Sequence, residues 1–249
     1  MTTTPSADDL DQLLRGLKLP KIRAILGREL AYAEAQCPSY SDFLARLLRE
    51  EYQSQQDRFM EYRIARAHLP ERWTLDTYPW ALQPGIRRAQ LLQLASLDFI
   101  ARAENLVLVG PTGVGKTGLA SALLLRALQA GYRGLFVKAQ ELFDEMYQSL
   151  ADRSSRRLID RLSRIELLLI DEMGYLNLRP EQSNIFFKLM EERYCRRVST
   201  IVTTNLSYDA WYEFLGNKEM VAALLDRVRY RCTTIEISGP SLRQARDDG

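Results

Sequence analysis

Residues 110–117 form a glycine-rich stretch of the kind that can hold phosphate groups. They read GPTGVGKT and match the pattern G-x-x-x-x-G-K-[ST] at every position. Glycines let the backbone turn tightly and point N–H groups at a phosphate, at the positive end of the helix that follows. Lys116 can reach the β- and γ-phosphates of a nucleotide, and the Thr117 hydroxyl can bind Mg²⁺. The predicted nucleotide contacts are Gly110, Pro111, Thr112, Gly113, Val114, Gly115, Lys116, Thr117 and Gly118.

A second stretch, IELLLIDEMGYL, places two adjacent acids after a run of apolar residues. If that run is a buried strand beside the loop, Asp171 can orient Mg²⁺ through its water shell. Glu172 can then polarise the water that attacks the γ-phosphate. The alternative is a core strand that ends in a solvated acidic turn. With the glycine-rich loop upstream, the adjacent pair favours hydrolysis over phosphoryl transfer to a small molecule.

Two later features can complete such a site. In the stretch STIVTTNL, Asn205 lies just past the C-terminal edge of a strand and can position the attacking water if this strand lies beside that of the glycine-rich loop; it is also a common residue of strand-ending turns. Arg227, Arg229 and Arg231 cluster at the end of a helical stretch. Charge on a γ-phosphate is often met by an arginine of a neighbouring subunit. An assembling enzyme with sites between subunits is therefore expected, against the alternative of ordinary charges at a helix C-terminus.

The composition is that of a soluble globular protein. The chain has 249 residues, 46% hydrophobic and 27% charged, which is enough for one sizeable core and a smaller appendage. Of its 34 basic residues, 28 are arginine. The planar guanidinium suits phosphate, so a nucleotide or nucleic acid partner is one explanation. A GC-rich genome is the other.

The cysteines and the N-terminus favour a cytoplasmic protein. The three cysteines lie far apart without a CxxC pair, which argues against a zinc site and against a disulfide framework. The N-terminus lacks the basic start and apolar stretch of a signal peptide, and no apolar run reaches ~18 residues. No membrane span is therefore expected. A single histidine removes most histidine-based catalysis from consideration.

The first part of the chain predicts a small all-α domain over residues 1–68. Leucines and isoleucines recur at spacings of three and four in 10–17 and 22–30. Pro20 is expected to open the second helix, and Ser41 to be the N-cap of a third. We expect contacts with DNA, with a partner or between subunits from this domain.

Residues 69–85 predict an ordered linker. Their sequence, LPERWTLDTYPWALQPG, has three prolines, two tryptophans and no clean period. We expect its aromatic side chains to dock on a neighbouring surface.

Residues 86–249 predict an α/β domain with a parallel sheet flanked by helices. After a helix over about 86–102, short apolar strands alternate with helices. The expected strands are 106–109, 134–137, 167–170, 200–203 and 234–237. The expected helices between them lie near 116–130, 139–150, 154–164, 180–194 and 218–229.

The segment 153–164 is strongly basic and could bind DNA. It has five arginines against one acid, Asp160, over about three helical turns. Such a surface would contact phosphates and give salt-dependent, largely sequence-independent affinity. A solvated basic face is the alternative. The candidate residues are Arg153, Arg156, Arg157, Arg161 and Arg164, with Arg58, Arg63 and Arg66 of the front domain as a weaker set.

Four segments together resemble the AAA+ ATPases of the IstB and DnaC group: GPTGVGKTGLASALL, LLLIDEMGYL, TIVTTNLSYDAW and LLDRVRYRCTTIEISGPSLR. The front end resembles the IstB family specifically, whose members are encoded beside a transposase in bacterial insertion sequences. The resemblance spans about residues 10–243. It implies an AAA+ fold, Mg²⁺-dependent ATP hydrolysis, assembly of a homo-oligomer on duplex DNA, and recruitment or stimulation of a separate cognate transposase.

The resemblance also implies roles for single residues, with two departures from the family pattern. Gly118 stands where the family usually has histidine, which costs some helix propensity. Leu242 replaces a more usual tyrosine in the tail. The implied roles are Walker A for Lys116 and Thr117, Walker B for Asp171 and Glu172, sensor asparagine for Asn205, arginine finger for Arg227 and second sensor for Arg243.

Two other functions compete with that of a transposition helper. A DnaC-like replicative helicase loader would share the ATPase core and differ in the front domain. A nucleotide-gated binding protein with little turnover is a different class, and Lys116, Glu172 and Arg227 speak against it. No carboxylate set resembles a nuclease site, so the chain is not expected to cut or join DNA itself.

Overall fold

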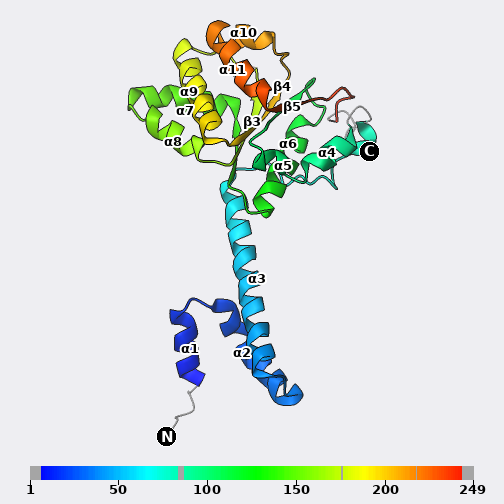
Figure 1. Ribbon diagram of the computed structural model, residues 1–249, viewed down its shortest axis with the longest axis vertical. Helices are drawn as coiled ribbons and strands as arrows, with labels where there is room; N and C mark the ends of the chain where they lie inside the picture. Colours follow the sequence, from blue (N-terminus) through cyan, green and yellow to red (C-terminus); the bar gives the residue numbers. More distant parts are fainter. Residues whose placement is uncertain (1–6, 84–86, 175, 217, 243–249) are drawn as a thin grey trace. The chain divides into compact units, whose positions relative to one another are not determined.

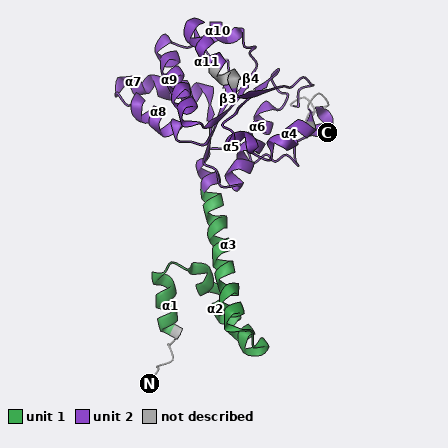
Figure 2. Ribbon diagram, viewed as in Figure 1, with its two compact units in different colours: residues 1–62 green, residues 63–249 purple. Residues whose placement is uncertain are grey.

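The computed structural model describes residues 7–83, 87–174, 176–216 and 218–242. The chain divides into two compact units, Met1–Tyr62 and Arg63–Gly249 (Figure 2). Each is described by itself. Within the described ranges, no helix combines the length and the apolar character that crossing a membrane requires.

The first unit is built from α1 (Ala7–Gly16), α2 (Pro20–Gln36) and the part of α3 (Tyr40–Arg66) that ends at Tyr62. Pro20 is the first residue of α2, as its fixed φ and missing N–H predict. The helices share a small core. Its buried members are Ile22, Ile25 and Leu47, with Leu14, Leu19, Leu26 and Phe43 packed against them.

The helix caps of this unit differ from the prediction. Ser39, not Ser41, caps α3, since its Oγ accepts a hydrogen bond from the backbone N of Asp42 at 3.1 Å. The N-terminus of α2 is capped from α3: a Glu51 carboxylate oxygen accepts the backbone N–H groups of Lys21 and Ile22, at 2.8 and 2.9 Å. A cap supplied by another helix has no local sequence signature.

The second unit contains a five-stranded parallel sheet in the order β2-β3-β4-β1-β5. Helices cover both of its faces (Figure 1). Strands buried on two faces read as continuous apolar runs, and Leu106, Val107 and Leu108 of β1 are fully buried. The predicted α/β class with a parallel sheet is confirmed. The strands are β1 (Asn105–Val109), β2 (Gly134–Lys138), β3 (Leu167–Met173), β4 (Ser199–Thr204) and β5 (Cys232–Glu236).

The helices of this unit follow the prediction with two corrections. The single helix expected over 86–102 is two short helices, because Leu97 is left-handed (φ 66°) and ends the regular backbone between them. A short helix before α11 was not predicted. The elements are α4 (Arg88–Leu94), α5 (Asp98–Ala101), α6 (Lys116–Gln129), α7 (Ala139–Ala151), α8 (Ser155–Ser163), α9 (Pro180–Arg196), α10 (Ala210–Leu215), α11 (Lys218–Tyr230) and the 3-10 turn η1 (Trp80–Leu82).

Candidate active site

The glycine-rich loop joins β1 to α6 at the carboxyl end of the sheet. Gly113 and Gly115 have φ values of 87° and 89°, in the region that favours glycine. A Cβ on Gly115 would lie 2.6 Å from the Tyr78 hydroxyl, so this position also needs glycine for space. The first N–H groups of a helix such as α6 have no partner within the helix, so they are available to an anion at the loop. This is the geometry of an anion-binding helix N-terminus.

Lys116 is the first residue of α6, and its ammonium group lies over the loop. Its Nζ donates hydrogen bonds to the carbonyl oxygens of Gly110 and Pro111, at 2.8 and 2.7 Å. The charge is therefore held beside the backbone N–H groups that form the phosphate cradle.

Asp171 of β3 and Thr117 of α6 are joined by a hydrogen bond. The Thr117 hydroxyl lies 2.9 and 3.1 Å from the two carboxylate oxygens of Asp171. Burial raises the pKa of Asp171, and hydrogen bonds from Thr203 and Thr117 oppose that rise. A buried carboxylate beside a hydroxyl is the donor pair that P-loop proteins use to hold Mg²⁺.

Thr203 of β4 connects the two acids. Its hydroxyl donates to Asp171 at 2.6 Å and accepts the backbone N–H of Glu172 at 2.9 Å. Glu172 is left-handed (φ 58°), at a shift in the register between β3 and β4, and its side chain is exposed to solvent. A left-handed non-glycine residue is strained, and such residues cluster at functional sites. The sequence analysis did not predict a role for Thr203. The available signal was the pair of threonines directly before Asn205 in STIVTTNL.

Asn205 follows β4, which pairs with β1 and so meets the condition set by the sequence. Its Oδ1 is buried and has no hydrogen-bond partner among the described residues. Gly174 is close, because a Cβ there would lie 3.1 Å from that oxygen. An unpaired buried acceptor costs about 1–3 kcal/mol. A water or ligand that donates to it would remove this cost.

Most of these residues, including Lys116, Thr117 and Glu172, line one cavity of about 640 Å³, a size suited to a nucleotide. Its far wall is the segment between α3 and α4. Tyr78 of this segment donates its hydroxyl to the Val114 carbonyl at 3.2 Å, and burial raises the pKa of Tyr78 to about 12. The expected docking of the linker aromatics is thus confirmed, and their surface is the phosphate loop. The cavity-lining residues of the loop, β3 and β4 are Thr112, Gly113, Gly115, Lys116, Thr117, Gly118, Glu172, Thr203, Thr204 and Asn205.

Gly118, the departure in the first turn of α6, lies under Trp73. A Cβ on Gly118 would lie 3.3 Å from the indole ring. The glycine therefore makes room for the tryptophan, which forms part of the cavity wall. Donors, volume and the unpaired Asn205 oxygen together fit a nucleoside triphosphate with Mg²⁺. Lys116 would hold its phosphates, and Thr117 and Asp171 its metal.

The structure does not describe the side chains of two predicted site residues, Arg227 and Arg243. Arg227 lies on α11, but its side chain is outside the described residues, as is that of Arg229. Arg243 is also outside them; its neighbour Leu242 donates its backbone N–H to the Gly113 carbonyl at 2.9 Å. Arg231 lies at the amino end of β1, where its carbonyl accepts the Asn105 N–H. The phosphate loop is at the carboxyl end of that strand.

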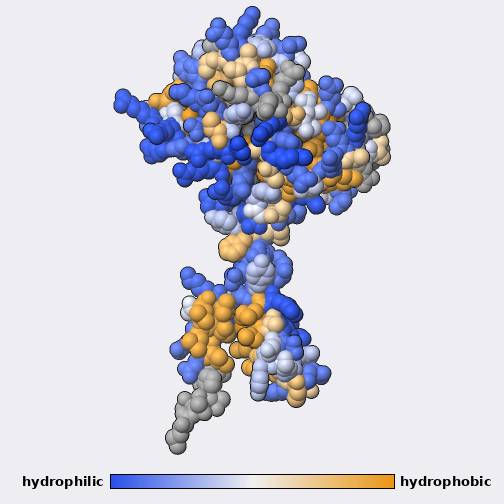
Figure 3. All heavy atoms as spheres, in the orientation of Figure 1, coloured by the Kyte–Doolittle hydropathy of each residue, from blue (hydrophilic) through white to orange (hydrophobic). Residues whose placement is uncertain are grey.

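The basic segment lies on and around α8. This helix buries Leu158 and Leu162 in the core and leaves all five predicted arginines exposed. Arg161 forms an ion pair with Glu145 of α7. Figure 3 shows hydrophilic side chains over the region of α7 and α8. The set is Arg153 in the turn before α8, Arg156, Arg157 and Arg161 on it, and Arg164 at its C-cap.

The weaker arginine set has contacts within the chain. Arg58 pairs with Glu51 at 3.2 Å. Arg63 donates its Nε to the Leu128 carbonyl at 3.0 Å, at the end of α6. These two side chains are therefore engaged in holding the fold.

Comparison with known proteins identifies the family. A family model described as IstB-like ATP binding protein matches residues 12–248. The chain belongs to this family. It is 36% identical over 235 residues to the protein assigned as ATP-binding in insertion sequence IS21 of Pseudomonas aeruginosa, covering 94% of this chain and 88% of that protein. The corresponding protein of IS5376 from Geobacillus stearothermophilus is 32% identical over 227 residues, with coverage of 91% and 90%.

Solved structures with the same fold come from replication proteins. DnaI is 26% identical, with a TM-score of 0.54, over 61% of this chain and 85% of that one. The DnaC helicase loader is 23% identical, with a TM-score of 0.55, over 66% and 96%. DnaA of Aquifex aeolicus bound to AMPPCP is 18% identical, with a TM-score of 0.57, over 69% and 51%. The IstB-like chain thus has the AAA+ fold, and ATP is the ligand that its family implies.

Proposed function

We propose that this IstB-like protein hydrolyses ATP, assembles as a homo-oligomer on duplex DNA, and recruits or stimulates the transposase of its insertion sequence. Relatives named for insertion sequences align with nearly the whole chain, which supports the transposition setting. The hydrolytic part rests chiefly on one observation: Thr203 bonds both to the Asp171 carboxylate and to the backbone of Glu172.

Each side chain at this site has a task that its position supports. Bound ATP with Mg²⁺ would supply the phosphoryl group that passes to water. Glu172 would accept a proton from that water, and the unpaired Oδ1 of Asn205 would orient it. Lys116 would meet the phosphate charge within the cradle. Arg227 of a neighbouring subunit would add a further positive charge, so that turnover depends on assembly.

Hydrolysis is tested with Glu172→Gln, which keeps the shape of the side chain and removes the base. Turnover should fall about 10²–10⁴-fold while ATP binding persists, because the metal and phosphate contacts remain. The variant should also hold an ATP-bound oligomer on duplex DNA. Glu181→Gln, at an exposed position in the first turn of α9, is the matched control. Unchanged turnover in Glu172→Gln would contradict the assigned base.

Binding to DNA is supported by the exposed arginines of α8. Arg156→Ala with Arg157→Ala should weaken binding to duplexes of any sequence. The slope of log affinity against log salt should become shallower by about 0.9 for each phosphate contact that is lost. Arg102→Ala is the control, because Arg102 is exposed and pairs with Glu104 elsewhere. Equal losses in the two proteins would place the DNA contacts elsewhere.

Self-assembly is supported by an apolar stripe on α3. Its side chains recur at spacings of three, four and seven, and each is about half exposed or more. Leu48→Glu with Tyr52→Glu should lower the mass measured by sedimentation, whereas Gln53→Glu, at an exposed position of the same helix that faces away from the stripe, should not. Unchanged mass would exclude the stripe as an oligomer contact. The stripe consists of Leu44, Leu48, Tyr52, Phe59 and Tyr62.

The partner separates the transposition helper from the helicase loader. The likeness to DnaC supports the fold alone, at 23% identity. Immobilised Glu172→Gln protein with ATP and duplex DNA should retain the transposase encoded beside it. Retention of the replicative helicase of the same host in its place would favour the loader.

A further inference from the structure

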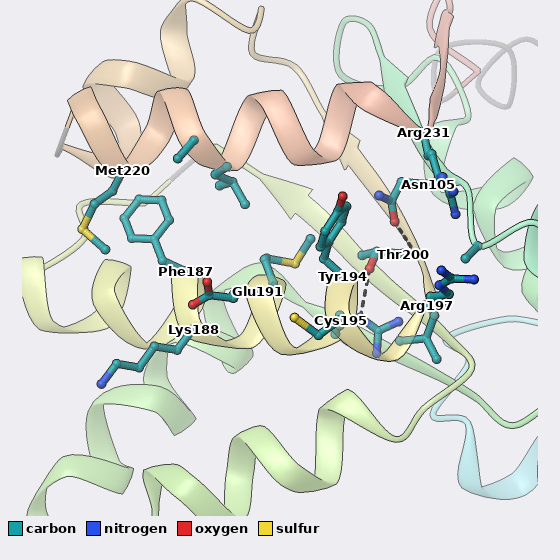
Figure 4. Close-up of a pocket in the computed structure, with 16 residues that line it drawn as sticks. Asn105, Phe187, Lys188, Glu191, Tyr194, Cys195, Arg197, Thr200, Met220 and Arg231 are labelled. Atoms are coloured by element: carbon teal, nitrogen blue, oxygen red, sulfur yellow. Dashed lines mark hydrogen bonds between the residues drawn. The ribbon is translucent and has the colours of Figure 1, made fainter.

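A second cavity lies at the opposite end of the sheet from the phosphate loop. It has a volume of about 410 Å³ and opens between α9 and α11, over the first residues of β1 and β4 (Figure 4). One part of its wall is apolar, and the other part is basic. The apolar members are Phe187 and Met190 of α9 and Met220, Ala223 and Leu224 of α11.

Arg193 forms the buried part of the basic wall. It is 1% exposed. Its Nε donates to the Thr200 hydroxyl at 3.0 Å, and its Nη atoms donate to three backbone carbonyls, those of Leu162, Ile165 and Ser199. These acceptors are neutral, and no carboxylate lies within ion-pair distance of Arg193 in the described part of the chain. Burial lowers the pKa of Arg193 to about 9, so the group remains a cation at neutral pH.

Further cations stand around this buried one. The exposed Arg197 and Arg231 lie at the same end of the cavity as Asn105, and Lys188 lies toward the other end (Figure 4). The single carboxylate among the lining residues is that of Glu191. Four cations against one anion, beside a low-dielectric wall, focus a positive potential into the hollow.

We propose that this cavity is a docking groove for a partner protein's segment in which an acidic side chain neighbours a large apolar one. The carboxylate would lie toward Arg197 and Arg231, and the apolar side chain would lie against Phe187 and Met220. A capping role of Arg193 at the end of α8 explains that residue but not the apolar hollow beside it. Nucleic acid fits less well, because a phosphate backbone gains nothing from the apolar wall.

The test uses a short fluorescein-labelled peptide of alternating leucine and aspartate, without nucleotide or DNA. Fluorescence polarisation should show saturable binding to the full-length protein. A peptide with asparagine in place of each aspartate should bind at least tenfold more weakly. Arg197→Ala with Arg231→Ala should weaken the acidic peptide to the same degree. Arg196→Ala is the control, since this neighbour is exposed, pairs with Asp160 and Glu192, and does not line the groove.

Alkylation of the cysteines locates the bound peptide. Cys195 lines the groove, whereas Cys37 is exposed in the first unit and serves as an internal reference. The acidic peptide should slow the modification of Cys195 and leave that of Cys37 unchanged, as read by mass spectrometry. Equal binding of the two peptides, insensitivity to the Arg197 and Arg231 changes, or full competition by citrate at millimolar concentration would each overturn the proposal. None of these outcomes depends on ATP hydrolysis.

Discussion

The two ends of the same sheet carry polar groups in different ways. At the carboxyl end, Thr117 and Thr203 both donate hydrogen bonds to Asp171, and the next residue of the strand is the left-handed Glu172. At the amino end, Arg193 bonds mainly to backbone carbonyls. In parallel α/β sheets, ligands usually bind beyond the carboxyl ends of the strands. We therefore expect the polar groups at the carboxyl end to act on a ligand, whereas Arg193 at the amino end holds the fold.

Arg193→Met should have the largest effect on stability. It removes the Arg193 donor from the Ile165 and Ser199 carbonyls and from the Thr200 hydroxyl, while the Leu162 carbonyl still accepts the backbone N–H of Arg164; each buried group left unpaired costs about 1–3 kcal/mol. We expect the free energy of unfolding to fall by about 3 kcal/mol, with nucleotide affinity unchanged in the folded protein. Denaturant unfolding measures the first quantity and titration with a fluorescent ATP analogue the second. Arg196→Met, at an exposed neighbour, should change stability by less than about 0.5 kcal/mol. An Arg193→Met protein with normal stability would contradict the conclusion that Arg193 holds the fold at the amino end of the sheet.

Thr203→Val should act chiefly on turnover. The isosteric change removes the hydroxyl that orients the Asp171 carboxylate and holds the Glu172 backbone. Loss of such an outer partner typically costs 10–100-fold in metal affinity or activity, and we expect a fall in kcat within about that range. Steady-state kinetics over a range of Mg²⁺ concentrations separates the two effects. Thr234→Val, at an exposed threonine bonded to Tyr208, is the control. Normal kinetics in Thr203→Val would mean that the carboxyl end does not depend on this threonine.

Gly118→His should weaken nucleotide binding by about tenfold. The new side chain would occupy the space of the Trp73 indole, which lies 3.3 Å from the position of a Cβ. Since Trp73 lines the cavity, its displacement alters the wall around the nucleotide. Trp73→Ala in the same chain should restore part of the loss, because it vacates that space. A double-mutant cycle on ATP affinity measures this coupling. Strictly additive effects would show that the two residues act independently.

Local patterns predicted much of the carboxyl end. The glycine loop and the start of α6 follow from neighbouring residues alone, and Asp171 and Glu172 follow from the end of an apolar run. The place of Asn205 depended on β4 lying beside β1, which the sequence could state only as a condition. The roles assigned to these residues stay predictions.

Contacts between distant segments could not be predicted. Thr203 matters because β4 lies beside β3, and Trp73 matters because its segment returns over α6. The break at Leu97 occurs in an apolar pattern that suits one helix equally well. Arg193 looks like one more charge near a helix end until the fold places β4 against it. In each case the missing information was a neighbour from another part of the chain.

Asp171→Asn should have the smallest effect on stability, and it should change stability and nucleotide binding in opposite directions. Burial raises the pKa of this carboxyl above its ordinary value of 3.8. The folded state therefore binds the proton more tightly than the unfolded state does, so the cost of the ionised group to folding grows as the pH rises above the ordinary pKa and is complete above the folded pKa. Removing the charge should raise the Tm of the nucleotide-free protein at neutral pH. Below the ordinary pKa, where both states are protonated, the gain over the parent should vanish.

The same change removes the carboxylate that we expect to hold the metal, so Mg²⁺-dependent nucleotide binding should fall. Calorimetry at several pH values, with and without nucleotide, measures both the rise in Tm and the loss of nucleotide binding. A lower Tm at neutral pH would show that the threonine hydrogen bonds outweigh the cost of burying the charge.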